Sequence, residues 1–374
     1  MTVAIREVRT NQDLQDFINL PLELYKGNPY YVPALRNNER NTLKKDKNPA
    51  FEYCQAAYWL AYQDNHPVGR IAGIINHRHF QKWNQPFARF GWLDFIDDRK
   101  VSGALFSTVE NWAAAQGMQA VHGPLGFTDL DRAGLLVAGF DQPGTLATIY
   151  NHPYYPEHLT AAGYSKDVDW VEYQISVPSG GVEKITRLAE AVARRYHLHL
   201  KHFNNKREML HYANAVFELL EEAYQHLYAM TPFTRRQMDD YIKQNFGFLS
   251  PDFVPAVVDE QDQLVAFGIS MPSLSRALQR CKGRLLPFGF IHLLRALRKN
   301  NLADLYLIAV KDSYQGKGVT AMLMAHMIEV FKRFGITTVE SNPELENNLK
   351  VQSQWKHFEH RQHKRRRCYI KYLQ

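Results

Sequence analysis

The chain has 374 residues, which is long for one domain and enough for two. Hydrophobic residues make up 45% and charged residues 22%, as in a typical globular protein, and no apolar run approaches the roughly 20 residues that span a bilayer. The net charge of +7 arises within residues 350–374, which hold eight Lys or Arg and one Glu, so the remainder is neutral, unlike a nucleic-acid-binding protein.

Terminal and cysteine patterns narrow the class further. The N-terminal stretch MTVAIREVRTNQDL lacks the charged and then apolar order of a signal peptide, so we expect a cytoplasmic protein. The widely spaced Cys54, Cys281 and Cys368 indicate neither a disulfide framework nor a metal cluster. The basic run His363–Arg367 is interpreted as a solvated turn and strand edge that could attract an anionic substrate.

The first half of the chain alternates strands and helices. Its periodicities predict, in order, a strand Ala4–Arg9, a helix Asp13–Tyr25, a hairpin of Tyr58–Gln63 and Val68–Asn76, a strand Phe90–Ile96, a helix Val101–Gln116, a strand Ala120–His122, a helix Pro156–Ala162 and a strand Trp170–Val177. The segment 123–144 has no clear structure, and irregular segments of this length are often functional. We expect it to form a wall of a substrate cleft, with Asp129, Asp131 and Arg132 as contributors.

Pro178-Ser179-Gly180-Gly181 is the clearest linker in the sequence, and the same order of elements begins again after it. The second half predicts helices Val182–Tyr196, Arg207–Leu227 and Arg235–Asn245, strands Leu198–Phe203, Val254–Val258, Leu264–Ser270 and Leu302–Val310, a helix from Val319 to Phe334, a strand Thr337–Glu340, a helix near Glu346–Trp355 and a strand Cys368–Leu373. We therefore expect two domains, at residues 1–178 and 182–374.

Gln315-Gly316-Lys317-Gly318 joins the strand that ends at Val310 to the helix that begins near Val319. Glycine tolerates a positive φ and lets the backbone approach a ligand, and the first amides of a helix have no partners within the helix. A strand, a glycine turn and a bare helix start together favour an anion site, most naturally for phosphate. The alternative is a connection that uses glycine only for tightness.

This stretch resembles the Q/R-x-x-G-x-G/A signature of the GNAT acyltransferase superfamily. Gln315 and Gly318 take the first two signature positions, and Thr320 stands where the final Gly or Ala is expected. Both halves also repeat the element order of that fold. The resemblance implies an α/β (α+β) protein of two tandem GNAT-like domains, each with a mixed, mostly antiparallel central sheet flanked by helices.

The resemblance also implies an acyl-CoA cosubstrate, acetyl-CoA or another acyl-CoA, and an N-acyltransferase, most simply an acetyltransferase, that acts on an amine of a small molecule or peptide. In this family the loop amides hold the coenzyme pyrophosphate, and the strand before the loop contacts the pantetheine arm. The implied coenzyme-binding residues are Ile308, Val310, Gln315, Gly316, Lys317, Gly318, Val319 and Thr320. No metal and no nucleic acid are implied.

Direct attack of an amine on a thioester needs a base for the amine and an acid for the departing thiolate. Glu340 is the first candidate for the base, because a partly buried carboxylate beside the strand opening could have a raised pKa. Tyr306 and Asp304 are further catalytic candidates. A solvated glutamate at the end of a strand is the alternative interpretation of Glu340.

The acid is harder to assign. Many family members carry a tyrosine seven residues after an asparagine in the late helix, but here Asn348 is followed at that distance by Trp355. An indole N–H does not release its proton at neutral pH. Either Tyr306 or Tyr369 donates the proton, or this half uses a modified mechanism.

The first half departs further from the family pattern. Its strand Gly91–Ile96 is followed by Asp97 and Asp98, with no glycine pair, and two carboxylates would repel a pyrophosphate. We therefore expect that the N-terminal half does not bind coenzyme A and instead supplies a wall of the substrate cleft.

Leu274–Asn300 is an insertion before the loop strand. Within 276–299 it combines basic residues with an apolar face (Arg276, Arg280, Arg284, Arg295, Arg298 and Lys299; Leu285, Leu286, Phe288, Ile291, Leu294 and Leu297). This pattern fits a helix packed on its own domain, which we expect first, a lid over an acyl chain, or contact with a membrane surface.

Two other functions compete with acyl transfer. A Fem-like aminoacyl transferase also pairs two GNAT-like halves and uses charged tRNA, but the neutral body and the intact coenzyme-type loop count against it. A non-catalytic acyl-CoA-binding or scaffold protein is favoured modestly by the loss of the usual tyrosine.

Overall fold

The computed structural model describes residues 2–374. The strands of its first half are β1 (Ala4–Glu7), β2 (Cys54–Gln63), β3 (His66–Asn76), β4 (Phe87–Phe95), β5 (Ala120–Gly123), β6 (Leu135–Ala138) and β7 (Ser165–Ser176). The helices of that half are α1 (Asn11–Leu24), α2 (Arg36–Leu43), α3 (His77–Trp83), α4 (Arg99–Ala115) and α5 (Tyr155–Ala161).

The second half begins after the predicted linker. Its strands are β8 (His199–Lys201), β9 (Ala256–Val258), β10 (Leu264–Pro272), β11 (Leu302–Val310), β12 (Thr338–Glu340), β13 (Glu344–Leu345) and β14 (His360–Tyr372). Its helices are α6 (Glu183–Tyr196), α7 (Lys206–His211), α8 (Ala213–Tyr224), α9 (Arg235–Asn245), α10 (Ser275–Cys281), α11 (Gly289–Arg298), α12 (Thr320–Phe334) and α13 (Leu349–Gln352).

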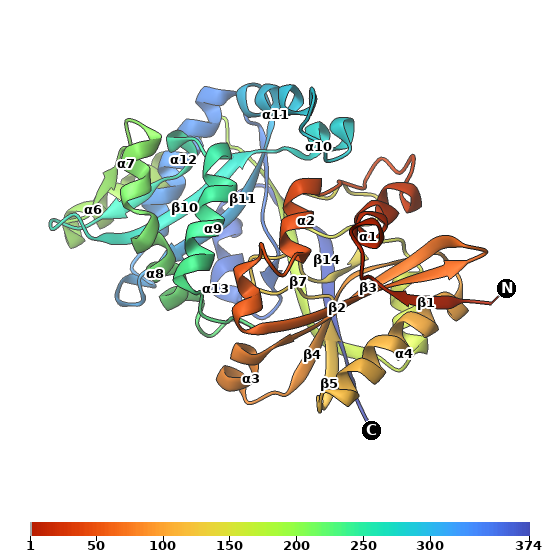
Figure 1. The fold of residues 1–374 in the computed structure, drawn as a ribbon. Coiled ribbons are helices and arrows are strands. Elements are labelled where there is room, and N and C mark those ends of the chain that lie inside the picture. The colour runs from red at the N-terminus through yellow and green to blue at the C-terminus, as the bar shows by residue number, and fades with distance from the viewer. Residues whose placement is uncertain (1) are drawn as a thin grey trace.

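The strands form one mixed sheet that runs through the whole molecule (Figure 1). Its main path is β1-β2-β3-β4-β5-β14-β7-β12-β11-β10-β9-β8, with β6 paired to β14 and β13 paired to β7. Within the described residues, the pairs β4–β5 and β11–β12 are parallel and the others are antiparallel. Helices cover the faces of the sheet, as the predicted α/β class requires.

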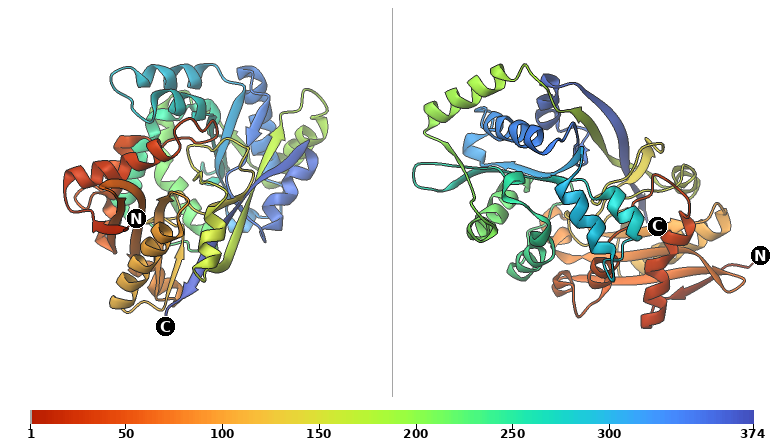
Figure 2. Two further views of the ribbon diagram at one scale, coloured as in Figure 1. Left: turned by 90° about the vertical axis from the view of Figure 1, so that its right-hand side faces the viewer. Right: turned by 90° about the horizontal axis from the view of Figure 1, so that it is seen from above.

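The last strands of the two halves are exchanged. β7, from the first half, pairs with β12 of the second half, and β14, from the C-terminus, pairs with β5 of the first half. β7 and β14 also pair with each other along most of their length, between the N-terminal and C-terminal parts in Figure 2. Because each half continues its sheet with a strand of the other, neither half completes its sheet alone. The domain boundaries at 178 and 182 stay a prediction.

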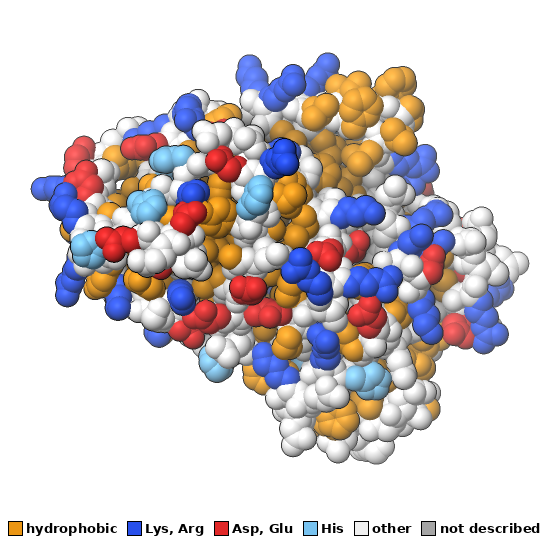
Figure 3. Space-filling model, turned by 60° about the vertical axis from the view of Figure 1, so that its left-hand side comes forward, with side chains coloured by type: hydrophobic (Ala, Val, Ile, Leu, Met, Phe, Trp, Pro, Cys, Tyr) orange, Lys and Arg blue, Asp and Glu red, His pale blue; other side chains and the backbone are white. Residues whose placement is uncertain are grey.

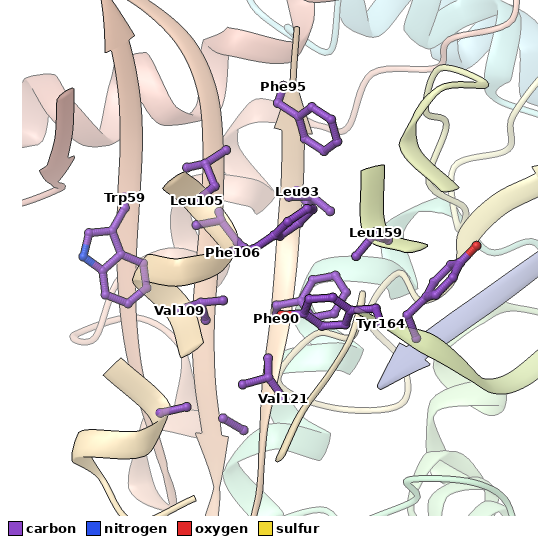
Figure 4. Packing of buried hydrophobic residues seen from close by; sticks show 14 of the residues in the cluster. Trp59, Phe90, Leu93, Phe95, Leu105, Phe106, Val109, Val121, Leu159 and Tyr164 are labelled. Carbon is purple, nitrogen blue, oxygen red and sulfur yellow. The ribbon is translucent and has the colours of Figure 1, made fainter. Parts of the chain in front are cut away.

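A core of aromatic and branched side chains holds α4 against the first half of the sheet. Leu105, Phe106 and Val109 are fully buried, and Figure 4 shows them beside the strands. The ring of Phe90 meets that of Tyr164 edge to face, with centroids 5.6 Å apart. The apolar residues of α4 recur at helical spacing and those of the strands alternate, so that both sets point into this core, as their periodicities predict.

The interpretation of the basic run His363–Arg367 as a solvated edge is wrong. β14 begins at His360 rather than Cys368 and lies inside the sheet between β5 and β7. The side chains of Lys364 and Arg366 are completely buried, since carboxylates on neighbouring strands neutralise them. The positive charge of the C-terminal segment therefore belongs partly to the core.

Two predicted helices also differ from those observed. The helix expected at Arg207–Leu227 is divided into α7 and α8 at Tyr212. The helix expected at Glu346–Trp355 is the single turn α13 followed by a 3₁₀ turn at Ser353–His357. The short late helix brings Trp355 back towards the end of β12, where it takes part in the site described below.

The insertion folds as α10 and α11, which pack on the molecule through buried residues that include Leu278 and Leu293. Its connecting turn lies against the first half, where the amide of Arg36 donates to the carbonyl of Gly283 at 3.0 Å. The insertion therefore packs on both halves of the chain, whereas packing on its own domain was the first expectation. No helix of the described chain combines the length and the apolar character that crossing a bilayer requires.

Candidate active site

The parallel strands β11 and β12 separate soon after they begin. Only the first three residues of β11, Leu302–Asp304, pair with Thr338–Glu340 of β12, whereas β11 continues to Val310. On its other edge β11 pairs with β10, and the register shifts so that Tyr306 lies in a bulge. The bulge and the separation create an opening in the sheet beside Tyr306.

The glycine loop lies at the end of β11, where the sequence predicts it. Gly316 and Gly318 have φ angles of 72° and 81°, which favour glycine. Val319 precedes α12 without a side-chain cap. Among the described residues, the amides of Gly316, Gly318, Val319 and Thr320 find no acceptor, so this helix start has free donors for an anion.

Two side chains of the loop are already engaged. The Gln315 amide donates to Asp312 Oδ1 at 2.7 Å, which holds the turn at the end of β11. The Lys317 ammonium lies 5.2 Å from the ring centroids of both Tyr196 and Tyr314. Lys317 therefore stays beside the bare helix start and adds positive charge there. Thr320 is the first residue of α12.

The free edge of β11 carries a polar contact at Ile308. The Tyr224 hydroxyl of α8 donates to the Ile308 carbonyl at 3.0 Å. Since Ile308 was expected to contact a pantetheine arm through its backbone, a ligand in this position would exchange that bond for its own. Val310, the last residue of β11, lies next to the glycine loop and is partly buried in the core between α6 and α12.

A cavity of about 590 Å³ passes through the opening. Apolar side chains of α8, β11, α12 and the segment after β12 line most of it, including Leu220, Leu307, Leu323, Met324, Met327 and Trp355. Its polar wall includes Asp129, Asp131, Tyr306, Ser341 and Glu344. The cavity therefore combines a long apolar volume with a few ionisable groups, as small-molecule sites commonly do.

Glu344 is an ionisable group of this cavity that the sequence analysis did not select. Its Oε1 accepts the indole N–H of Trp355 at 2.9 Å, while its buried Oε2 has no partner among the described residues. Burial raises the pKa of Glu344 to about 7, and the hydrogen bond from Trp355 acts in the opposite direction. The free Oε2 can therefore donate or accept a proton near neutral pH.

The predicted base Glu340 lies in a buried ion cluster. Its Oε2 is 3.0 Å from Lys364 Nζ, which also lies 3.1 Å from Glu172. Arg366 contacts the other oxygen of Glu172. Burial raises the pKa of Glu340, although the Lys364 charge lowers it. Glu340 thus joins β12 to the exchanged strands β7 and β14, and its role as a base stays a prediction.

Asp304 and Tyr306 form the second predicted group. The Tyr306 hydroxyl lines the cavity and donates to Asp304 Oδ2 at 3.3 Å, while Asp304 Oδ1 has no partner among the described residues. Burial, and next the charge of Glu340, raise the pKa of Asp304 to about 7. The pair therefore joins the cavity to a buried carboxylate that can take up a proton. The catalytic role of Tyr306 also stays a prediction.

The segment 123–144 lines the cavity, as expected of a cleft wall. The Asp129 carboxylate accepts the amide of Thr231 at 3.1 Å and that of Asp131 accepts the amide of Thr128 at 2.9 Å. Burial raises their pKa values, to about 7 for Asp129 and to about 6 for Asp131. Arg132 instead donates to the carbonyl of Leu146 and so joins this segment to the chain that follows it.

The equivalent opening of the first half is closed. β4 and β5 also separate after a short parallel pairing, but Leu125 lies between them and donates its amide to Phe90 at 2.8 Å. The start of α4 is capped by Asp98, which accepts the amide of Lys100 at 2.8 Å. A helix start capped by its own carboxylate, next to a filled opening, offers no place for a pyrophosphate.

Comparison with known proteins agrees with this geometry. Residues 213–356 match the family model of the acetyltransferase (GNAT) family. The fold is similar to that of a tandem GNAT protein from the clavulanic acid biosynthesis pathway, with a TM-score of 0.57 and 12% identity, over 100% of this chain and 99% of that one. The chain therefore has the fold of tandem GNAT proteins.

Other similar proteins also align over most of the chain. A GCN5-related N-acetyltransferase from Sphaerobacter thermophilus has a TM-score of 0.53 and 11% identity, over 100% of this chain and 96% of its own. Protein YghO of Escherichia coli is 27% identical over 382 residues, 99% of this chain and 95% of that protein. The bacterial ceramide synthase of Caulobacter vibrioides is 27% identical over 324 residues, 84% and 82% of the two chains. The expected fold class is thus confirmed.

Proposed function

We propose that this tandem GNAT protein is an acyl-CoA-dependent N-acyltransferase whose second half holds the coenzyme. The observation that carries the proposal is the set of unpartnered amides of Gly316, Gly318, Val319 and Thr320, beside an opening that leads into the cavity. The loop amides would bind the pyrophosphate with Gln315 and Lys317 beside them. The backbone of Ile308 and Val310 would face the pantetheine arm.

The acyl group is proposed to be long rather than acetyl. A volume of about 590 Å³ with mostly apolar walls exceeds what an acetyl group needs. Each methylene buried there contributes about 0.8 kcal/mol to binding. The similarity to a ceramide synthase supports the same direction, because a ceramide is the amide of a long-chain amino alcohol. We therefore propose a long-chain amine, such as an amino alcohol, as the acceptor.

In the proposed reaction the amine nitrogen forms a bond to the thioester carbonyl carbon and the C–S bond breaks. The amine proton passes to the Tyr306 oxygen as the Tyr306 proton passes to Asp304, whose ionised form is the base. Glu344 in its protonated form donates to the departing thiolate through Oε2. Glu344 would thus take the role of the tyrosine that Trp355 replaces.

Glu340 fits a supporting role in this scheme. Its Oε2 is engaged by Lys364, and its charge raises the pKa of Asp304. Replacement of Glu340 by Gln would then lower the pKa of Asp304 and move the acid limb of the pH profile to lower pH. Loss of catalysis without such a shift would make Glu340 the base instead.

A non-catalytic acyl-CoA-binding protein is the second candidate, and Trp355 in place of the tyrosine favours it. One experiment separates the two: the purified protein is incubated with acetyl-CoA or palmitoyl-CoA and a panel of amines that includes sphinganine, and mass spectrometry detects amide and free coenzyme A. The proposal expects an amide with palmitoyl-CoA. Binding of acyl-CoA without turnover across the panel would favour the second candidate, and absence of binding would reject both.

A further inference from the structure

The turn between α10 and α11, together with the first half of α11, exposes large apolar side chains. Leu286 and Phe288 are 78% and 71% exposed, and Phe290 and Leu294 are 43% and 49% exposed. We call these four residues the insertion tip. Figure 3 shows hydrophobic side chains gathered at the upper edge of the molecule, with Lys and Arg side chains beside them. Such a grouped apolar surface marks a contact site more often than a free surface.

The charges around the insertion tip have one sign. Residues 275–300 contain seven cations and no Asp or Glu (Arg276, Arg280, Lys282, Arg284, Arg295, Arg298 and Lys299). In the described part of the chain none of the seven forms an ion pair with a carboxylate. Elsewhere Arg70 of the core and Lys364, Arg365 and Arg367 of β14 form ion pairs with carboxylates. The surface therefore attracts an anionic partner.

A recess beside the insertion tip carries more positive charge. It has a volume of about 310 Å³ and lies between α1, α2 and the turn at Gly283–Leu286. Arg36, Arg40 and Arg284 line it together with Leu286. Arg36 and Arg284 lie on the same recess, and burial and next the charge of Arg284 lower the pKa of Arg36. Guanidinium groups in such a recess suit a phosphate.

The insertion is also continuous with the wall of the cavity. Tyr306 and Phe248 line the cavity, and both pack in the same hydrophobic cluster as Leu293 of α11 and Leu278 of α10. The cluster that anchors the insertion thus also contributes side chains to the cavity wall.

We propose that the insertion tip and its surrounding cations dock this protein on the surface of an anionic lipid bilayer. Leu286, Phe288, Phe290 and Leu294 enter the boundary between headgroups and acyl chains, while Arg280, Arg284 and the recess meet lipid phosphates. α11 has ten residues, about 15 Å of helix, so it lies in the interface and does not cross it. An anionic bilayer is the partner that matches both features, because its phosphates complement the cations and its acyl chains accept the apolar side chains.

Vesicle flotation tests the proposal without any acyl transfer. The full-length protein is mixed with vesicles of phosphatidylcholine alone or with added phosphatidylglycerol. We expect it to float with the anionic vesicles and to be released by salt. Each cation near the surface contributes about fivefold to the affinity. The double variant R280E/R284E should therefore lose at least about 25-fold, and L286S/F288S should lose binding at all salt concentrations.

Matched variants outside the surface are the controls. Leu349 is 69% exposed on α13 and Lys184 is exposed on α6. L349S and K184E therefore remove an exposed apolar side chain and reverse an exposed positive charge outside the insertion. Both should float like the wild type. All variants should melt like the wild type, because the changed side chains are exposed. Equal flotation of wild type and L286S/F288S would overturn the proposal. So would a dimer in light scattering that only this variant abolishes, because the surface would then join two copies.

Discussion

The indole nitrogen of Trp355 lies 2.9 Å from Oε1 of Glu344, at the wall of the cavity. One carboxylate oxygen is thereby fixed and the other is left free. Trp355 stands at the position where the family resemblance implies a proton-donating tyrosine, and an indole cannot take over that chemistry. Burial raises the pKa of this carboxyl group to about 7 at the opening, and we propose it as the proton donor in place of that tyrosine.

Replacement of Glu344 by Gln tests this assignment. The amide cannot donate a proton as an acid, so we expect kcat to fall about 100-fold or more. The wild-type pH profile of kcat/KM should be bell-shaped around pH 7, because Asp304 must be ionised and Glu344 protonated. The alkaline limb should be absent in the variant. The control Glu359→Gln, at an exposed position, should leave the profile unchanged.

Replacement of Trp355 by Phe should move the same limb. Removing the indole N–H removes the hydrogen bond that lowers the pKa of Glu344, so that pKa should rise. Activity should then persist to higher pH, even if kcat is lower. A lower kcat with an unmoved alkaline limb would mean that Trp355 only fills space.

Glu344 should also make stability depend on pH. Its pKa rises from 4.5 in the unfolded chain to about 7 in the folded protein, so the folded state binds more protons between these values. Its contribution is therefore favourable at low pH and lost as pH rises through about 7, at a cost of up to about 3 kcal/mol. Urea unfolding should show Glu344→Gln gaining stability over the wild type between pH 5 and pH 8. A difference independent of pH would contradict the raised pKa.

Lys364 should be essential for stability. It lies completely buried between Glu172 and Glu340, so replacement by Met leaves two buried carboxylates with less compensation. Breaking a buried ion pair in this way typically costs about 3–5 kcal/mol. Urea unfolding of Lys364→Met should show a loss of this size. Lys356→Met, at an exposed position, should lose less than about 0.5 kcal/mol.

A larger side chain in the cavity should change the preference for acyl length. Met324 lines the cavity from α12, and Trp at this position would displace part of a long chain. Loss of burial for about two methylenes corresponds to about tenfold in the ratio of kcat/KM for palmitoyl-CoA to that for octanoyl-CoA. Glu329→Trp, exposed on the same helix, should leave the ratio unchanged. An equal ratio in Met324→Trp would mean that the chain does not enter here.

Local patterns were sufficient to predict the glycine loop. β11 spans Leu302–Val310 as predicted, and Gly316 and Gly318 have positive φ angles. Each of these features depends on residue types within a short continuous stretch of the chain. The hairpin turn at Asp64 and Asn65, whose φ angles are 48° and 61°, was predictable for the same reason. Features that depend on a few neighbouring residues can be recognised without the rest of the chain.

Features that depend on distant partners were not predictable. The burial of Arg366 requires Glu172, which lies 194 residues earlier, and the strand exchange that brings them together leaves no local signal. The position of Glu344 in the cavity depends on its contact with Trp355, and the family pattern marks Trp355 only as a replacement for a tyrosine. An acidic residue eleven positions before that tryptophan, just beyond β12, was the available signal.

Calorimetric titration of coenzyme A and palmitoyl-CoA tests the central claim most directly. Gly316 and Gly335 both have a φ of 72° and open space around a Cβ atom, one in the loop and one at the end of α12. Valine at either position introduces similar backbone strain, on the order of 1–2 kcal/mol. The account predicts that the wild type and Gly335→Val bind both ligands, whereas Gly316→Val loses them although it unfolds at the same urea concentration as Gly335→Val. No binding by the wild type, or equal weakening in both variants, would contradict it.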